Sequence, residues 1–223
     1  MKDVIRNHPR PSAELLERFS DQQPATLHES MGKRGALAND IRPAWFGTRV
    51  CGSALTVHCR PGDNIMLHKA VSIAQPGDVL VVSADGFTEA GMWGEIITVA
   101  AIEKGIRGIV TDGGVRDTMP IYKLGFPMYA RGFSMKGTTK ATGGTINQPI
   151  VIGGVQVKPG DIVVGDNDGV VVVPLEEAEA ILTAAIARER NEASVMDRIR
   201  AGESTMDILG FQATYDRLGL SEE

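Results

Sequence analysis

The sequence is short of cysteine, aromatic residues and long apolar runs, and it has no excess of positive charge. Two cysteines among 223 residues, with no His/Cys pair at zinc-ligand spacing, exclude a disulfide framework and a zinc site. The longest near-continuous apolar stretch, residues 96–102, is much shorter than the ~20 residues of a membrane span. Because 23 basic residues face 28 acidic ones, nucleic acid is not an expected partner. The first residues contain no apolar signal region, so we expect a cytoplasmic protein.

Glycine, in contrast, is abundant, with 26 glycines against 11 aromatic residues. Its share exceeds the average of about 7%. Glycine is favoured where the chain turns tightly and where a backbone must approach a ligand closely. Both uses are expected here.

The middle of the chain alternates between strand and helix patterns. Pro-Gly-Asp turns at 76–78 and 159–161 lead into runs at 79–82 and 162–164 that are apolar at every position, as in a sheet covered on both faces. A helix over 93–104 is predicted by an apolar face of Trp93, Ile96, Ile97, Ala100 and Ala101. A strand at 108–111, a helix at 118–124 and a strand at 126–130 follow. This order predicts an α/β fold with a parallel βαβ core.

The two ends of the chain are predicted to be helical. Helices are expected at 12–19 and around 26–31, strands dominate 48–59 and 145–173, and a long helix spans 176–201. The apolar stripe of the long helix fades after Arg188, which favours projection of its second half toward a neighbouring subunit. Because no linker divides the chain, we predict one domain over 1–223, with N-terminal helices at about 12–35, a core at about 36–175 and a C-terminal helix at about 176–201.

The most informative stretch is Thr-Asp-Gly-Gly-Val-Arg-Asp at 111–117, between a predicted buried strand and a predicted helix. Parallel α/β proteins bind ligands beyond the carboxyl ends of their strands. Arg116 and Asp117 would place an anion-binding guanidinium beside an oxygen ligand for a hard cation. In the alternative interpretation, Asp117 only caps the helix that begins at Thr118, and Arg116 is an ordinary surface residue.

A second candidate is the first turn of the preceding helix, at Gly94, Glu95, Ile96 and Ile97. Its amide groups lack helical partners and the helix dipole adds positive potential, so a small carboxylate can bind there. Alternatively, Glu95 only complements the helix dipole. Because a βαβ unit brings the start of its helix and the end of its second strand to one rim, we expect both stretches to face one cavity.

With these residues assembled, the sequence resembles the metal-dependent 4-hydroxy-4-methyl-2-oxoglutarate/4-carboxy-4-hydroxy-2-oxoadipate aldolases, which share a superfamily with regulator of ribonuclease activity A. The resemblance covers about 25–201. It is carried by Gly94-Glu95 followed after twenty residues by Arg116-Asp117 in DGGVRD, by TLHE at 26–29, by PGDN at 61–64 and by DNDGVVVVP at 166–174.

The resemblance implies a swivelling β/β/α type of fold, a homotrimer or a hexamer of trimers, and class II pyruvate aldolase chemistry with Mg²⁺ or Mn²⁺. By motif position, Asp117 matches the metal ligand and Arg116 the residue on the carbonyl side of pyruvate. Gly94, Glu95, Ile96 and Ile97 match the backbone cradle for the pyruvate carboxylate. The resemblance also suggests that a carboxylate from a neighbouring subunit, near Glu192, completes the site.

The reaction implied is cleavage of a 4-hydroxy-2-oxo acid to pyruvate and a second oxo acid through a metal-stabilised enolate, with oxaloacetate decarboxylation as a second activity. Because no lysine stands in this group to form a Schiff base, the metal route is favoured over the covalent one. Glu95 would hold a water on the metal. A water on the metal is our first candidate for the base, and Glu29, His68 and Glu192 are peripheral candidates.

One departure and two alternatives stay open at this point. The family carries Asp where this sequence has Glu95, which leaves the native substrate open and allows a different 2-oxo acid. The other alternative is a non-catalytic regulator of ribonuclease activity that acts by binding other proteins. Regulator-type sequences lack an aspartate corresponding to Asp117, so its presence here favours metal chemistry.

Overall fold

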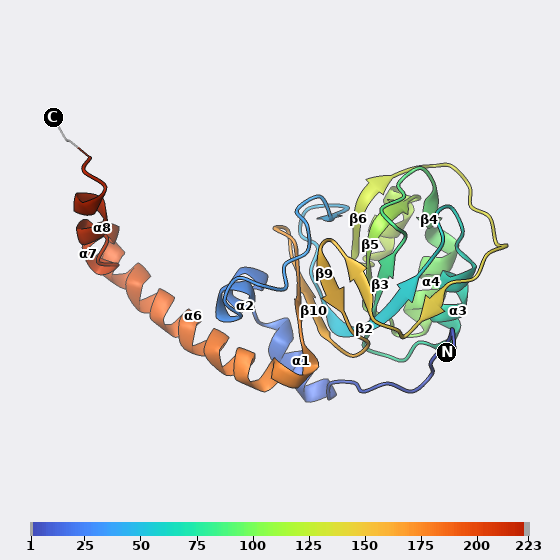
Figure 1. Cartoon of the computed structure of the whole chain (residues 1–223), viewed down its shortest axis with the longest axis horizontal. Coiled ribbons are helices and arrows are strands. Elements are labelled where there is room, and N and C mark those ends of the chain that lie inside the picture. The colour runs from blue at the N-terminus through green and yellow to red at the C-terminus, as the bar shows by residue number, and fades with distance from the viewer. Residues whose placement is uncertain (1, 221–223) are drawn as a thin grey trace.

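A curled sheet of nine strands forms the centre of the computed structural model, which describes residues 2–220 (Figure 1). The strands run in the order β1-β6-β5-β3-β2-β10-β11, with β4 paired to β5 and β7 to β2. A separate hairpin, β8–β9, packs near β2 and β3. The strand bounds are β1 (Arg42–Pro43), β2 (Val50–His58), β3 (Asp78–Ser83), β4 (Gly91–Trp93), β5 (Gly108–Val115), β6 (Met128–Phe133), β7 (Thr145–Ile146), β8 (Ile150–Ile152), β9 (Val155–Val157), β10 (Ile162–Gly165) and β11 (Val170–Val173).

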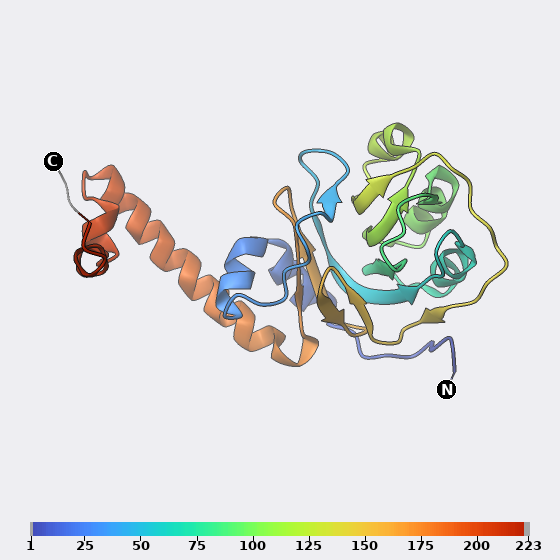
Figure 2. The same ribbon diagram turned by 45° about the horizontal axis from the view of Figure 1, so that its top comes forward.

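The predicted parallel βαβ core is confirmed. Strands β2, β3, β5 and β6 are parallel neighbours, and both β3 and β5 are buried at every position. Helices α3 (Ile65–Ile73), α4 (Glu95–Glu103) and α5 (Thr118–Leu124) lie together beside this part of the sheet (Figure 2). The sheet's other face packs against β8–β9 and the inner side of β10–β11. The result is a nearly closed, barrel-like sheet.

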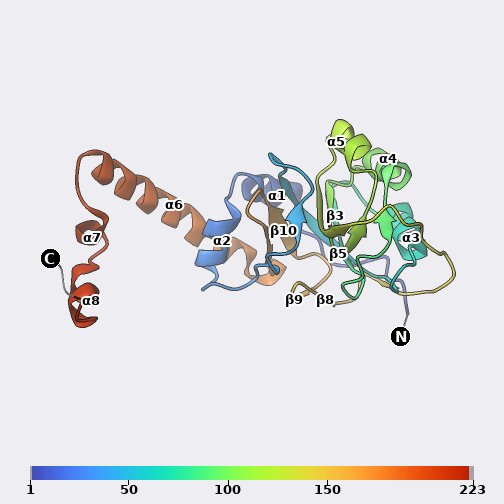
Figure 3. The same ribbon diagram turned by 90° about the horizontal axis from the view of Figure 1, so that it is seen from above.

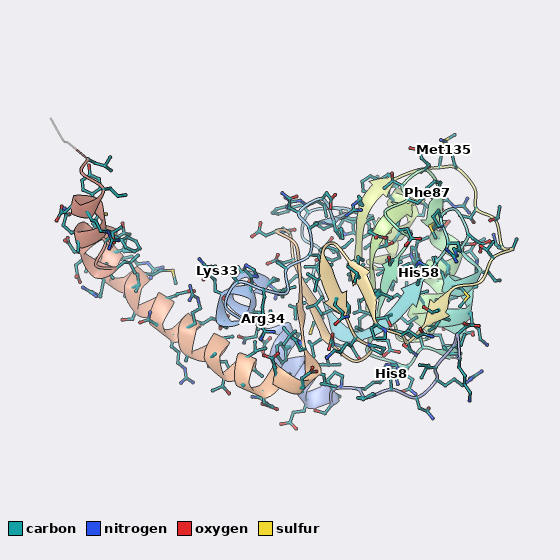
Figure 4. The ribbon with its side chains drawn as sticks, viewed as in Figure 1. His8, Lys33, Arg34, His58, Phe87 and Met135 are labelled. Carbon is teal, nitrogen blue, oxygen red and sulfur yellow. The ribbon has the colours of Figure 1, made fainter. Side chains whose placement is uncertain are left out.

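The helices at the two ends of the chain pack together on the outer side of β10–β11. Ser12 caps α1 (Ala13–Ser20) by accepting a hydrogen bond from the Leu15 amide at 3.1 Å. Helix α2 (Pro24–Ser30) and the first turns of α6 (Ala178–Arg200) complete this cluster, and a 3₁₀ turn at Leu175–Glu177 precedes α6. Arg34, which follows α2, pairs with Glu177 and ties the two ends together (Figure 4).

The second half of helix α6 projects away from the body of the protein. The loss of its apolar stripe after Arg188 predicted this projection. The helix buries Ala178, Ile181, Leu182 and Ala185, all in its first eight residues, and the rest of the helix extends outward (Figure 1). Two short helices, α7 (Thr205–Ile208) and α8 (Gln212–Arg217), lie at its far end, opposite α3–α5 (Figure 3). The sequence patterns did not predict α7 and α8. Within residues 2–220, no helix is long and apolar enough to span a membrane.

The apolar face predicted for the helix over 93–104 is confirmed at Ile97 and Ala101 and wrong at Trp93, Ile96 and Ala100. Trp93 belongs to β4, where it stacks on Phe126 with 5.9 Å between ring centroids. Helix α4 instead buries Ile97, Thr98 and Ala101, while Ile96 is 83% exposed. Trp93 was misassigned because it precedes the helix start, and Ile96 and Ala100 were misassigned because their side of the helix does not face the sheet.

Candidate functional site

Arg116 and Asp117 leave the end of β5 in an unusual turn. The Arg116 amide donates to the Trp93 carbonyl at 2.9 Å, which ties the turn to the end of β4. Asp117 has left-handed backbone angles, with φ 57° and ψ 37°. This conformation is disfavoured for most residues with a side chain, although aspartate tolerates it better than most. The turn directs the Asp117 side chain toward the start of α4.

The carboxylate of Asp117 caps α4 rather than the helix that follows it. The Glu95 amide donates to Asp117 Oδ2 at 3.0 Å, and no side-chain cap from Asp117 forms on α5. Asp117 does occupy the N-cap position of α5, where its carbonyl accepts from the Ile121 amide at 3.0 Å, but the alternative interpretation is wrong for its side chain, which caps α4 instead. Arg116 Nε lies 3.6 Å from the same oxygen. Asp117 Oδ1 makes no hydrogen bond with any residue in 2–220, and it remains available to a ligand.

Glycine is required where these groups meet. A Cβ on Gly94 would lie 2.6 Å from Asp117 Oδ2 and 3.0 Å from Arg116 Nε. The backbone angle of Gly94, φ −152°, is one that any residue adopts, so space and not conformation imposes the glycine here. A Cβ on Gly91 would lie 2.6 Å from the Arg116 Cβ. The close approach at Gly94 is that of the protein's own side chains, and close approach of a ligand there stays a prediction.

Two further hydrogen bonds, both made by the buried Thr98 hydroxyl, fix the start of α4. Trp93 Nε1 donates to Thr98 Oγ1 at 2.7 Å, and that hydroxyl donates to the Gly94 carbonyl at 2.9 Å. Within the described chain, the amides of Gly94, Ile96 and Ile97 have no hydrogen-bond partner, whereas the Glu95 amide is taken by Asp117. Of the four amides predicted to bind a carboxylate, three are therefore available and that of Glu95 is not.

An open cavity of about 140 Å³ lies against this turn. Arg116, Gly94, Ile96, Ile97 and His68, all predicted site residues, line it together. Asp117 adjoins the cavity through its contacts with Gly94 and Arg116, and Glu95 is exposed beside it. The remaining lining residues are Asn64, Gly91, Met92, Thr138 and Lys140. The expectation that the two motifs face one cavity is confirmed for Arg116 with Gly94, Ile96 and Ile97, whereas Asp117 and Glu95 do not line it.

The opposite wall depends on Asp63, which the sequence analysis did not identify as a site residue. Its buried carboxylate accepts hydrogen bonds from the amides of Ile65, Ala141 and Thr142 and from the Thr139 hydroxyl. Burial alone would raise the pKa of Asp63, but these donors outweigh it and hold the pKa well below its usual value. Asp63 therefore stays ionised and fixes the loop that carries Lys140.

Asn64, the next residue, presents an unsatisfied polar atom at the cavity. Its Nδ2 donates to the Met92 carbonyl at 2.9 Å, while its Oδ1 is buried without a hydrogen-bond partner in the described part of the chain. A buried acceptor without a donor is costly unless a ligand or water supplies one. The Pro-Gly-Asp-Asn motif signalled this loop, but only tertiary contacts show that it reaches the site.

His68, one turn into α3, is the titratable base of the cavity wall. Burial, with a smaller contribution from the nearby Lys140 charge, lowers its pKa below the ordinary 6.5. The imidazole is therefore neutral at pH 7 and able to accept a proton. The sequence placed His68 at the periphery, and the structure places it on the cavity wall.

Glu29 and Glu192 lie elsewhere in the chain. Arg188 pairs with Glu192 at 2.8 Å and lies 3.7 Å from Glu29, where α2 meets α6. This cluster and α4 lie on opposite sides of the molecule (Figure 3). Within one chain these carboxylates do not join the site, and a role for Glu192 in a neighbouring subunit stays a prediction.

Metal ligation here rests on few side chains. Across residues 2–220, no group of three or more His, Cys, Asp or Glu side chains is arranged to hold a metal ion. Both cysteines are free and buried, and burial raises the thiol pKa to about 11 for Cys51 and about 12 for Cys59. Any metal at this site would take its protein ligand from Asp117, with other oxygens supplied by substrate and water.

Fold and site together define an α/β protein whose arginine and aspartate meet the first turn of a helix at one rim of a curled sheet. The sequence profile of the RraA-like family, described as Aldolase/RraA, matches residues 16–172, and the chain belongs to this family. The predicted fold class and family are confirmed.

Individual relatives support the same assignment. A protein of Halalkalibacterium halodurans named "Putative 4-hydroxy-4-methyl-2-oxoglutarate aldolase" is 37% identical over 169 residues, which are 74% of this chain and 80% of that protein. The solved structure of Streptomyces coelicolor RraAS2, described as an unusual member of the RNase ES inhibitor RraA family, is 33% identical with a TM-score of 0.76, covering 85% of this chain and 100% of that one. An uncharacterized Pseudomonas syringae protein has a TM-score of 0.78 at 29% identity, covering 89% and 93%.

Proposed function

We propose that this protein is a divalent-metal-dependent pyruvate aldolase that cleaves a 4-hydroxy-2-oxo acid, of the 4-hydroxy-4-methyl-2-oxoglutarate type, to pyruvate and a second oxo acid. The observation that carries the proposal is the placement of Asp117. Its carboxylate is fixed on the start of α4, beside Arg116 and the cavity, with Oδ1 left without a partner. The similarity to the H. halodurans protein supports the same reaction class.

The residues at this rim fit a magnesium or manganese ion. Both ions favour oxygen ligands, and Mg²⁺ commonly binds through one or two carboxylates with several waters. Asp117 supplies such an oxygen, its side chain is 38% exposed, and Glu95 stands exposed beside it. When bound, the ion would supply Lewis-acid polarisation of the substrate's 2-oxo group.

The protein's own groups orient the 2-oxo acid. The amides of Gly94, Ile96 and Ile97 can donate to the substrate carboxylate, assisted by the positive end of the α4 dipole. Arg116 then faces the oxygen on which charge grows as the carbon–carbon bond breaks. A preorganised donor at such a position contributes about 3–4 kcal/mol to transition-state stabilisation.

A proton must also leave the 4-hydroxyl of the substrate. Of the side chains that line the cavity, His68 is the one that can accept a proton at neutral pH, because Arg116 and Lys140 are cationic. We assign His68 as the base contributed by this chain. Lys140, on the loop fixed by Asp63, is placed to pair with a second carboxylate on the substrate.

Oxaloacetate decarboxylation is proposed as a second activity at the same site. Loss of CO₂ from oxaloacetate leaves pyruvate enolate, the same fragment that aldol cleavage leaves beside Arg116. The amide cradle, Arg116 and the same bound metal ion would therefore serve both reactions.

We also propose that the chain works as a homo-oligomer, a trimer or a pair of trimers. Three apolar side chains on α4 are exposed, namely Ile96 (83%), Val99 (44%) and Ile102 (38%), and Met119 and Tyr122 extend the apolar surface onto α5. An apolar face of this kind, beside a site, is typical of an interface. The outward turns of α6 would carry Glu192 to the site of a neighbouring copy.

The second candidate function is regulation of a ribonuclease by protein binding. It is favoured by the similarity to the S. coelicolor structure, whose description names an RNase inhibitor family. This function needs neither Asp117 Oδ1 nor the amide cradle.

One assay separates the two candidates. Purified protein is incubated with a panel of 4-hydroxy-2-oxo acids and with oxaloacetate, and released pyruvate is measured with and without a chelator. We expect release that a chelator abolishes and that Mg²⁺ or Mn²⁺ restores. If no substrate in the panel yields pyruvate, the result supports regulation of a ribonuclease. Pyruvate release after complete metal removal would rule out the metal mechanism.

A further inference from the structure

A second cavity lies at the edge of the sheet where β2 and β5 begin. Its volume is about 350 Å³, and its lining residues are Ser20, Arg49, Val50, Cys51 and Arg107. Because β5 runs from Gly108 to Val115, this cavity and Asp117 lie at opposite ends of the same strand, about 25 Å apart. It is therefore separate from the proposed aldolase site.

Arg49 is held in place at one wall of the cavity. Its Nη2 donates to the carbonyls of Ser20 and Gln22, each at 3.1 Å, at the C-terminal end of α1. Its Nε and Nη1 make no hydrogen bond within the described residues. A guanidinium fixed by one nitrogen keeps the rest of its planar fork free for an oxyanion.

Arg107 supplies a second charge that the protein does not neutralise. Its amide donates to the Asp78 carbonyl at 2.8 Å, which fixes its backbone just before β5. In the described part of the chain, its guanidinium has neither a hydrogen bond nor an ion pair. The Asp78 carboxylate is committed elsewhere, since it pairs with Arg10 at 3.1 Å and accepts the Gln75 amide.

The rest of the lining adds no negative charge. Cys51 donates its thiol to the Leu16 carbonyl, and burial raises its pKa to about 11, so it is neutral at pH 7. Asp21, the C-cap of α1, is exposed and does not line the cavity. Two positive charges thus share one concave space without a carboxylate, an arrangement that attracts anions. The volume lies in the range of small-molecule sites.

We propose that the Arg49–Arg107 cavity binds a small molecule carrying a doubly charged oxyanion, either a phosphate group or a pair of carboxylates. Arg49 would bind it through its free nitrogen atoms and Arg107 through its unpaired guanidinium. Val50 would contact an apolar part of the same ligand. This binding does not depend on the aldolase reaction.

Isothermal titration calorimetry with inorganic phosphate, and separately with succinate, tests the proposal on the full-length protein. We expect saturable binding of at least one of the two probes, and the tighter one identifies the oxyanion. Arg107→Gln should raise the dissociation constant at least ~10-fold, the loss of about one charge-assisted contact. If Arg107→Gln fails to fold, Arg107→Lys keeps the charge but removes bidentate binding, and it should weaken binding in the same direction.

Two control variants locate the binding. Lys104→Gln removes one positive charge near Arg107 without altering the lining, and Arg116→Gln removes the arginine of the aldolase site. Both should leave the dissociation constant within about twofold of the wild type. The proposal is overturned if neither probe binds saturably, if Lys104→Gln weakens binding as much as Arg107→Gln, or if only Arg116→Gln abolishes it.

Discussion

At the scale of single residues, the geometry of Asp117 explains why this rim differs from an ordinary helix start. A left-handed aspartate after β5 reaches back across the βαβ unit to cap α4, and Arg116 is drawn to the same carboxylate. The sequence predicted both residues and their common rim, because strand ends and helix starts meet there in any parallel sheet. It could not predict which helix Asp117 caps, since that depends on a single φ angle.

The space at Gly94 yields the sharpest prediction for a single residue. Gly94→Ala would place a methyl 2.6 Å from Asp117 Oδ2, so the carboxylate must move. The displaced atoms end flexible side chains, and we therefore expect little change in thermal stability but a fall of about 100-fold in kcat/KM for pyruvate release. Gly137→Ala, where no atom lies within 4 Å of the added Cβ, is the control. Equal activity in the two variants would show that the contact has no role.

A pH profile tests the role of His68. Burial lowers the pKa of His68 below 6.5, so the imidazole is neutral at pH 7. The value of kcat/KM should therefore fall only when the pH approaches and drops below this lowered pKa. His68→Gln should lower kcat/KM at pH 7 by about 100-fold or more and remove the acid limb. His28→Gln, on α2, should change neither. An unaltered acid limb in His68→Gln would assign the base to another group.

At the scale of elements, the sequence predicted the strands and helices of the core well and their exposed faces poorly. A short run of apolar residues directly after a Pro-Gly-Asp turn, as at 79–82, is typical of a buried strand, so β3 was located correctly. Helix α4 packs against the sheet through Ile97 and Ala101 but leaves Ile96 exposed, and a periodic pattern does not distinguish a face buried in its own chain from one available to a partner. Gly113 and Gly114, in the stretch at 111–117 that ends in Arg116 and Asp117, do not line the cavity. A Cβ on either would instead meet the loop at 84–90, so they serve strand packing.

The loop over 134–144 depends on Asp63, which gives a prediction for stability. The folded pKa of Asp63 lies below its unfolded value of 3.8, so its stabilising contribution is present above about pH 4 and is lost as the pH falls below it. At pH 7, Asp63→Asn should lower the free energy of unfolding by about 2 kcal/mol, because hydrogen bonds to a charged group weaken. Urea denaturation measures this change.

Asp197→Asn, at an exposed ion pair on α6, is the matched control and should have almost no effect. If Asp63→Asn also raises KM more than it lowers kcat, the loop with Lys140 contributes to substrate binding. If Asp63→Asn and Asp197→Asn have the same free energy of unfolding, Asp63 does not stabilise the loop over 134–144.

At the scale of the whole molecule, the chain has features that a single copy does not use. Helix α6 extends far from the body (Figure 1), and apolar side chains of α4 and α5 stand exposed. No sequence pattern locates an interface of this kind, because the partner residues are absent from any local window. This shape supports the proposed homo-oligomer, in which a neighbouring copy completes the site.

Val99→Glu tests the association. Val99 is 44% exposed on α4 and does not line the cavity, so a charge there should leave the fold intact but be costly in a buried interface. We expect light scattering after gel filtration to give a trimer or hexamer for the wild type and a smaller species for Val99→Glu, with weaker pyruvate release. Val151→Glu, at 61% exposure on β8, should assemble normally. A monomeric wild type would contradict the proposed oligomer.

We propose that Asp117, Arg116 and the α4 amides form one metal-dependent aldolase site. Its most direct test is the rate of pyruvate release from 4-hydroxy-4-methyl-2-oxoglutarate, measured for wild type and Asp117→Asn over a range of Mn²⁺ concentrations. We expect Mn²⁺-dependent turnover in the wild type and, in a folded Asp117→Asn variant, a loss of at least ~100-fold that added Mn²⁺ does not reverse. Equal Mn²⁺-dependent rates in both proteins would contradict it.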